Sequence, residues 1–269
     1  MSAVASVLPV FRRELRQTWR ETLGWTLGLA AVLLVYLPLY PSFAGQSQMQ
    51  EILDMLPEAM VRALGFDLIA TGAGYTQSTF FGLLGFVLTS LAAAGWGAQA
   101  IAGNEESGRL ELDLAHGIGR VGYALELALA MLARLVWFGV FSALVLFALN
   151  GPAQLDLEPG NVVAACATMV GLAFVPGAFA LATGALTGRR SLAMAVGSIV
   201  LAGAYGLNAV ANQSADLDSL RRFSPYGWAW GNAPLMNGAD WPGLAALGAT
   251  SMVLVVLAVW FTRRRDVTG

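Results

Sequence analysis

Lysine is missing from this sequence of 269 residues, so all 15 of its basic residues are arginine. A Walker A phosphate loop needs a lysine on the nucleotide phosphates, and the chain therefore cannot contain one. Cysteine and histidine are each present only once. The single Cys166 excludes a disulfide within the chain, and the single His116 excludes the paired-histidine sites of zinc hydrolases.

Charge is also scarce, whereas apolar residues are abundant. Charged residues make up 12% of the chain and hydrophobic residues 57%, and the mean hydropathy is +0.64. These values disfavour both a disordered chain and a soluble globular domain. Six apolar stretches are each long enough to cross a hydrocarbon core of about 30 Å. They cover approximately residues 23–40, 80–101, 125–149, 162–186, 192–211 and 244–261. We predict an all-α membrane protein with six transmembrane helices in one domain, residues 23–269, and no nucleic-acid partner.

The segment before the first span, residues 1–22, has the pattern of an amphipathic helix. Apolar residues recur every three or four positions and arginines lie between them. The apolar set is Val4, Leu8, Phe11, Leu15 and Trp19, and the basic set is Arg12, Arg13, Arg16 and Arg20. A basic face suits anionic headgroups, so we expect this helix to lie flat on the cytoplasmic surface in contact with membrane lipid. The alternative is a charged flank that only orients the first span.

Ser42-Phe43-Ala44, after the first span, resembles a signal-peptidase site. The apolar region is longer than that of a signal peptide, so we expect this span to be retained as an anchor. An external loop, residues 41–78, would follow. Helical spacing of apolar residues predicts a kinked helix over residues 46–64 in this loop. That helix would cap the fold at the outer interface, or it is a plain surface helix without a transport role.

The arginines outside the spans are distributed very unequally. One side of the membrane would carry eleven and the other only three, so the positive-inside rule predicts that both termini are cytoplasmic. The eleven are Arg12, Arg13, Arg16, Arg20, Arg109, Arg120, Arg189, Arg190, Arg263, Arg264 and Arg265. The three are Arg62, Arg221 and Arg222.

The cytoplasmic loop between the second and third spans, residues 103–123, has the densest charge in the chain. Its charged residues are Glu105, Glu106, Arg109, Glu111, Asp113 and Arg120. We expect a brief helix with its carboxylates directed outward, and a turn at Gly117 and Gly119 that leads into the next span. The alternative is a solvated loop whose charges only keep it out of the bilayer.

The stretch Asn104-Glu105-Glu106-Ser107-Gly108-Arg109-Leu110-Glu111-Leu112 resembles the first cytoplasmic loop of export-type ABC transporter permeases of the type-2 family. Ser224-Pro225-Tyr226, the Pro234-Leu235, Gly238 and Trp241 run, and the closing residues 261–266 are similar to the C-terminal half of that family. The resemblance covers essentially the whole chain. It departs from the family at Arg109, where a small hydroxyl residue is common, and at His116-Gly117, where a proline is common.

The resemblance implies a permease subunit without an ATPase site or a bound cofactor of its own. A separate ATP-binding cassette subunit would bind ATP and Mg, and a second permease subunit, identical or different, would complete the pathway. The complex would export an amphipathic or lipophilic substrate, such as a drug, antibiotic, lipid or peptide, across the cytoplasmic (inner) membrane of a bacterium or archaeon. By the same resemblance, the residues that couple the two kinds of subunit would be Glu105, Glu106, Gly108, Arg109, Glu111 and Arg120.

Polar residues inside two spans are candidates for lining the translocation pathway. They are Thr89, Trp96 and Gln99 in the second span and Tyr205, Asn208 and Asn212 in the fifth. Hydrogen bonds between helices are the alternative explanation for each of them. The third span carries Glu126 and Arg134 early in its length. We expect Arg134 to snorkel toward the inner interface rather than to act in a proton relay.

Two other classes of function remain as alternatives. An intramembrane protease is suggested by Glu105-Glu106 followed by Arg109, but the spacing is one residue too short and histidine ligands are lacking. An ion-coupled carrier would need a buried acid and an inverted repeat, and neither is evident in the sequence.

Overall fold

The computed structural model describes residues 8–43, 71–115, 117–213 and 215–265. These residues form helices joined by short turns and contain no strand. Six helical segments of this part of the chain are long and apolar enough to cross a membrane. They are Trp19–Ser42, Gly72–Glu106, Arg120–Asn150, Pro159–Thr187, Arg190–Ala211 and Trp241–Arg264. The predicted all-α fold with six spans is confirmed.

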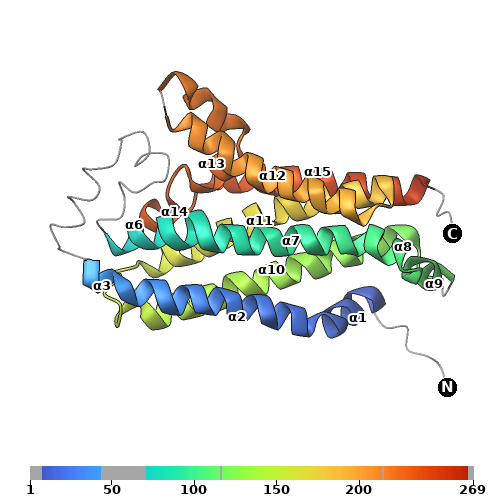
Figure 1. Ribbon diagram of the computed structural model, residues 1–269, viewed down its shortest axis with the longest axis horizontal. Coiled ribbons are helices and arrows are strands. Elements are labelled where there is room, and N and C mark those ends of the chain that lie inside the picture. Colours follow the sequence, from blue (N-terminus) through green and yellow to red (C-terminus); the bar gives the residue numbers. More distant parts are fainter. Residues whose placement is uncertain (1–7, 44–70, 116, 214, 266–269) are drawn as a thin grey trace.

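The six spans run side by side along the long axis of the molecule (Figure 1). Helix α11 (Pro159–Thr187) lies at the centre and contacts α7 (Gly85–Ala98), α10 (Arg120–Asn150), α12 (Arg190–Ala211) and α15 (Trp241–Arg264). The most apolar windows of the second and fourth spans are each 67% buried, whereas those of the other four are 17% to 33% buried. The second and fourth spans therefore form the core, and the others present wide apolar faces.

Small residues explain why α7, α11 and α12 approach so closely. A Cβ atom on Gly97 would lie 2.1 Å from the carbonyl oxygen of Gly177. A Cβ atom on Gly197 would lie 2.8 Å from the Cβ atom of Ala94 and 3.1 Å from the carbonyl oxygen of Pro176. The hydrophobic effect does not drive helices together in lipid. Van der Waals contact at small residues therefore supplies much of the packing energy. This three-helix crossing fixes the core of the bundle.

The second span is built from α6 (Gly72–Thr76), the π-helical segment η3 (Gln77–Leu84), α7, the π-helical segment η4 (Gln99–Gly103) and α8 (Asn104–Glu106). It begins at Gly72, so the prediction of an external loop reaching residue 78 and a span starting near Phe80 is wrong at this boundary. Gln77 is polar but 4% exposed, and its Oε1 accepts a hydrogen bond from the Leu235 N–H at 3.1 Å. Hydropathy alone therefore placed the start of this span too late. The predicted helix over residues 46–64 lies outside the described residues.

The N-terminal segment differs from the predicted single helix over residues 1–22. Helix α1 (Pro9–Gln17) ends before Thr18, and α2 (Trp19–Tyr36) starts the first span. The span continues through the short turns η1 (Leu37–Leu39) and α3 (Tyr40–Phe43). Val10 is 1% exposed and packs with buried residues of α10 and α11. One face of α1 is thus bound to the bundle itself.

Three short helices lie between α12 and α15. They are η5 (Ala215–Phe223), α13 (Pro225–Trp230) and α14 (Pro234–Asn237). The Ser224 side chain caps α13 by accepting a hydrogen bond from the Gly227 N–H at 3.1 Å. The Tyr226 hydroxyl donates to the Gly82 carbonyl oxygen at 2.8 Å and so ties α13 to the second span.

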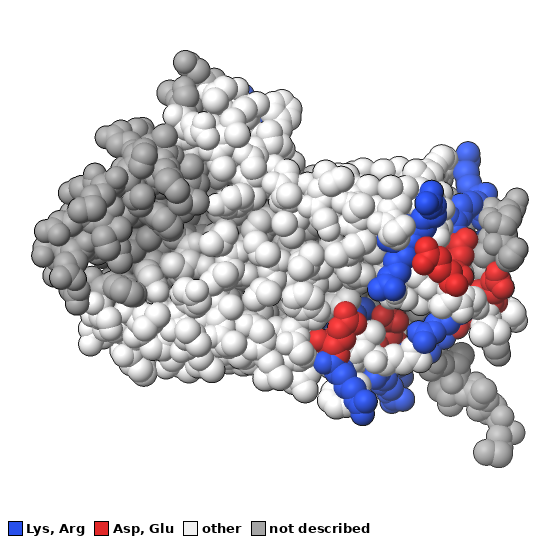
Figure 2. Space-filling model, in the orientation of Figure 1, with Lys and Arg blue, Asp and Glu red and all other residues white. Residues whose placement is uncertain are grey.

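Charged side chains gather at the opposite end of the bundle. Figure 2 shows them at the right-hand end, whereas the long middle of this face is free of them. Helices α8 and α9 (Arg109–Ala115) lie at this end, as do the start of α1 and the end of α15 (Figure 1). By the positive-inside rule, we expect this end to face the cytoplasm.

Candidate functional site

The loop after the second span folds into two short helices at the charged end of the bundle. Helix α8 (Asn104–Glu106) continues the span, and α9 (Arg109–Ala115) follows after a turn at Ser107-Gly108. Gly108 has φ +70°, and its N–H donates to the Glu105 carbonyl oxygen at 2.9 Å. Gly117, with φ +85°, begins the return to α10. The brief helix and the role of Gly117 are as predicted, whereas Gly119 has an ordinary φ of −68°.

Helix α9 has a buried face and an exposed face. Leu110 is 1% exposed and packs into the bundle, whereas Leu112 is 63% exposed. Arg109 and Glu111 are exposed beside Leu112. We name α8, α9 and the turn between them, residues 104–115, the coupling surface. It presents an apolar side chain among opposite charges, a composition suited to a protein partner.

Asp113 corrects the prediction that every carboxylate of this loop is directed outward. It is 7% exposed, and its two oxygens accept hydrogen bonds from the two terminal nitrogens of Arg13 on α1. This bidentate hydrogen bonding to Asp113 raises the pKa of the Arg13 guanidinium. Helix α1 is thereby fastened to the inner side of α9.

The same helix is also fastened to the third span. The backbone N–H of Phe11 donates to Glu126 Oε2 at 2.9 Å, and Glu14 Oε1 accepts from Arg134 Nη2 at 3.2 Å. A sequence pattern could not predict these contacts, because Phe11 and Glu126 are 115 positions apart and Glu14 and Arg134 are 120 positions apart. Helix α1 therefore connects the coupling surface to α10.

The remaining predicted coupling residues are joined to two other spans. Glu105 forms an ion pair with Arg265 at the end of α15, and the Arg265 carbonyl oxygen accepts from Arg120 Nη1 at 2.7 Å. Glu106 Oε1 accepts from the backbone N–H of Arg190, the first residue of α12, at 2.8 Å. The structure thus brings the six predicted coupling residues to one end of the bundle. Their role in coupling stays a prediction.

The six predicted pathway residues are not brought together. Thr89 is buried, and its hydroxyl donates to the Gly85 carbonyl oxygen at 2.7 Å within its own helix. Tyr205 makes a T-shaped contact with Tyr226 of α13, with ring centroids 5.4 Å apart, and α13 lies toward the end of the bundle opposite the coupling surface (Figure 1).

The two asparagines lie in the same region of the fifth span. The Oδ1 atom of Asn208 faces Gly227 of α13, and the Oδ1 atom of Asn212 accepts from Arg221 Nη2 at 2.5 Å. Only Trp96 and Gln99 of the six line a pocket near the coupling surface.

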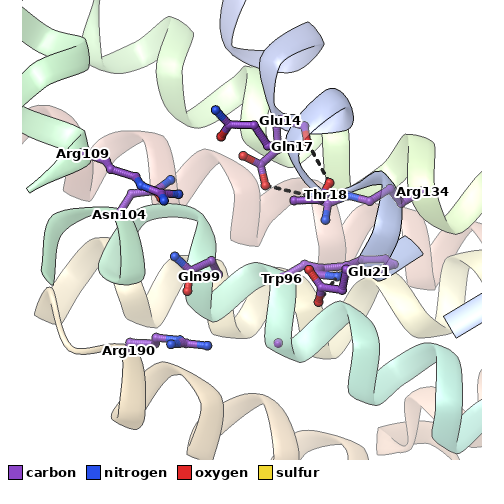
Figure 3. Close-up of a pocket in the computed structure, with 11 residues that line it drawn as sticks. Glu14, Gln17, Thr18, Glu21, Trp96, Gln99, Asn104, Arg109, Arg134 and Arg190 are labelled. Carbon is purple, nitrogen blue, oxygen red and sulfur yellow. Dashed lines mark hydrogen bonds and ion pairs between the residues drawn. The ribbon is translucent and has the colours of Figure 1, made fainter. Parts of the chain in front are cut away.

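This inner pocket has a volume of about 460 Å³ (Figure 3). It lies between α1 and α2 on one side and the second span on the other. Its lining residues are Glu14, Gln17, Thr18, Glu21, Gly95, Trp96, Gln99, Asn104, Arg109, Arg134 and Arg190. Five of the eleven lining residues are charged, and these five come from five different helices. The pocket is therefore a polar cavity at the inner end of an apolar bundle.

Arg134 does not snorkel, contrary to the prediction. It is 4% exposed, and its guanidinium lies 4.5 Å from the centroid of the Trp96 ring. The indole N–H of Trp96 in turn donates to Glu21 Oε1 at 2.9 Å. Acids on α1 and α2 compensate the buried charge, and a pattern confined to the third span could not reveal them.

Comparison with known families agrees with this geometry. The family model described as "ABC-2 family transporter protein" matches residues 8–267, which is nearly the whole chain. No curated protein sequence matches the chain. The matched region includes α1, all six spans and the coupling surface. The chain is thus a multi-pass membrane component of an ABC transporter, and it belongs to the ABC-2 family of transporter proteins.

Proposed function

We propose that this chain is the permease subunit of an ATP-driven exporter in the cytoplasmic membrane of a bacterium or archaeon. A separate ATP-binding cassette subunit hydrolyses ATP with Mg and docks on the coupling surface. A second permease subunit, identical or different, completes the pathway. The substrate is amphipathic or lipophilic, of the class that includes drugs, antibiotics, lipids and peptides.

The exposed face of α9 is the observation that carries this proposal. An apolar side chain that is 63% exposed, Leu112, stands between Arg109 and Glu111 at the end of the bundle that carries most of the charge. This face lies at the charged end of the bundle, which the positive-inside rule assigns to the cytoplasm. A protein partner at this face would bury the leucine and pair the charges.

The contacts behind this face explain how a partner could act on the spans. Helix α9 is held to α1 by Arg13 and Asp113, and α1 is held to α10 by Glu14 and Arg134. Helix α8 contacts the start of α12 through Glu106 and the end of α15 through Glu105. Packed helices move as units between discrete arrangements, so a displacement of the coupling surface would reach three spans.

The wide apolar faces of the outer spans support a second permease subunit. The most apolar windows of the first, fifth and sixth spans are only 17% to 22% buried within the chain. A pathway between two such subunits needs faces of this kind, with lipid covering the rest.

A cysteine at position 112 tests where the partner docks. The one native cysteine, Cys166, is buried, so Leu112→Cys introduces an accessible thiol. With a membrane-permeant maleimide photocrosslinker, we expect Leu112→Cys to form an adduct with a protein that carries a Walker A lysine. Phe223→Cys is the matched control, because Phe223 is 73% exposed in η5, remote from the coupling surface.

The same two variants test the orientation of the chain in the membrane. A membrane-impermeant maleimide should label Phe223→Cys in intact cells and Leu112→Cys only after the membrane is permeabilised. Labelling of Leu112→Cys from outside, or an adduct at Phe223→Cys instead of Leu112→Cys, would contradict the proposed docking of an ATP-binding subunit on α9.

A further inference from the structure

The inner pocket contains a buried cationic group whose hydrogen bonds are incompletely satisfied. Arg134 Nη2 donates to Glu14, and its Nε lies 3.4 Å from the Ala130 carbonyl oxygen. Its Nη1 is buried and has no acceptor among the described residues. Figure 3 shows the guanidinium reaching from α10 into the space between Thr18 and Trp96. An unsatisfied donor on a buried arginine is costly, so an acceptor is expected at this point.

The charges around the pocket favour an anionic acceptor. Its lining contains three arginines and two glutamates. Both glutamates already accept hydrogen bonds, Glu14 from Arg134 and Glu21 from the Trp96 indole. The side chains of Arg109 and Arg190 have no such partner in the part of the chain that the structure describes. The lining therefore has one positive charge in excess, with donors directed at the cavity from two sides (Figure 3).

An apolar strip leads away from the pocket along α7. Gly95 and Gln99 line the pocket. Val87 and Leu91 precede them at intervals of four residues and are each 36% exposed. Residues spaced by four lie on one face of a helix, so the strip and the pocket are continuous. Helices α2 and α12 both contact α7 and flank this face.

We infer that the inner pocket binds the anionic oxygen headgroup, a phosphate or carboxylate, of an amphipathic molecule. Arg134 Nη1 holds the head at the base of the pocket, and Arg109 and Arg190 neutralise it from the open side. The apolar part of the molecule lies along Val87 and Leu91. The identification of the bound molecule as the transported substrate rests on the proposed function. Binding itself does not, because it requires neither ATP nor a partner subunit.

Titration of the purified full chain in a neutral maltoside detergent tests the inference, with dodecyl phosphate as the probe. We expect saturable binding that weakens about tenfold or more in Arg134→Gln, because a hydrogen bond to a charged group is lost. Arg134→Gln leaves Glu14 buried without its partner and could therefore impair folding. Two further variants test binding without removing this ion pair.

The first is Gly95→Leu, which fills the pocket without changing its charge, because a Cβ atom at Gly95 meets no other atom within 4 Å. The second is Arg190→Gln, at an exposed position. Both should weaken binding, whereas Arg263→Gln should not, because Arg263 is an exposed arginine outside the pocket. Unchanged binding in Gly95→Leu and Arg190→Gln, or equally tight binding of dodecyltrimethylammonium, would overturn the inference.

Competition with phosphatidylglycerol distinguishes the two sources of such a headgroup. Displacement of dodecyl phosphate by this lipid would assign the pocket to a membrane phospholipid. Failure to displace it would assign the pocket to a single-chain amphiphile, and either result supports an anionic headgroup site. Absence of binding would leave the docking of an ATP-binding subunit at α9 untouched, and absence of docking would leave the binding result standing.

Discussion

Replacing Gly108 with proline is expected to lower transport about tenfold or more, a change of ~1.4 kcal/mol in the activation free energy, while the chain still inserts and folds. Gly108 has φ +70°, and proline is fixed near −65°. The substitution also removes the N–H that donates to the Glu105 carbonyl oxygen at 2.9 Å. The turn between α8 and α9 then cannot form, and α9 is no longer held at its present angle to the second span. ATP hydrolysis by the complex should no longer respond to cargo.

Gly108→Asn is the matched control for this prediction. Asparagine tolerates the left-handed conformation better than other side chains, and a Cβ atom at Gly108 meets nothing within 4 Å. We therefore expect Gly108→Asn to retain most of the activity. Glu106→Ala, which removes the acceptor for the Arg190 N–H, should also uncouple hydrolysis from transport. Unchanged cargo-stimulated ATPase activity in Gly108→Pro and Glu106→Ala, measured in proteoliposomes, would remove the coupling role from this turn.

Replacing Gly97 with valine is expected to destabilise the whole bundle. A Cβ atom at Gly97 would lie 2.1 Å from the Gly177 carbonyl oxygen, and backbone cannot yield as a flexible side chain can. The core pair α7 and α11 must separate to admit the side chain. We expect the free energy of unfolding to fall by about 3 kcal/mol or more. This would be seen as a lower unfolding temperature in detergent and a smaller monodisperse peak in size-exclusion chromatography.

Gly203→Val provides the comparison for Gly97→Val. Gly203 lies in the middle of α12, is exposed, and would carry a Cβ atom with no neighbour within 4 Å. Any general effect of valine in a helix should appear equally in both variants. Equal unfolding temperatures for the two would show that the close approach of α7 and α11 does not control stability.

The number of spans could be predicted because it depends on a one-dimensional property. A run of apolar residues long enough to cross a bilayer is visible in the sequence whatever the helices pack against. The boundary at Gly72 could not be predicted in this way. Gln77 and Thr76 are polar yet buried against other helices, and only the tertiary contact with Leu235 compensates Gln77. The packing role of Gly97 likewise depends on Gly177, which lies opposite it on α11 and is 80 positions away in the sequence.

The coupling surface could be located from its charge and from the family resemblance, but its internal contacts could not. The sequence predicts that Asp113 is directed outward with the other carboxylates, because its partner, Arg13, is 100 positions away. The position of Arg134 early in the third span predicts that it reaches the interface, because its partner Glu14 lies 120 positions away. In both cases helix α1 supplies the missing partner. The sequence pattern predicts a membrane-binding face from the arginines of α1 and indicates no role for Glu14.

The claim that this chain works with a separate ATP-binding subunit is tested most directly by purification from native membranes. The full chain would be tagged, solubilised gently and analysed for what co-purifies with it. We expect a subunit with a Walker A lysine in an amount equal to that of the permease. That subunit should be lost when residues 105–114 are replaced by a neutral linker, while the variant chain is still recovered folded. Recovery of the chain alone, under conditions that preserve known membrane complexes, would contradict the account.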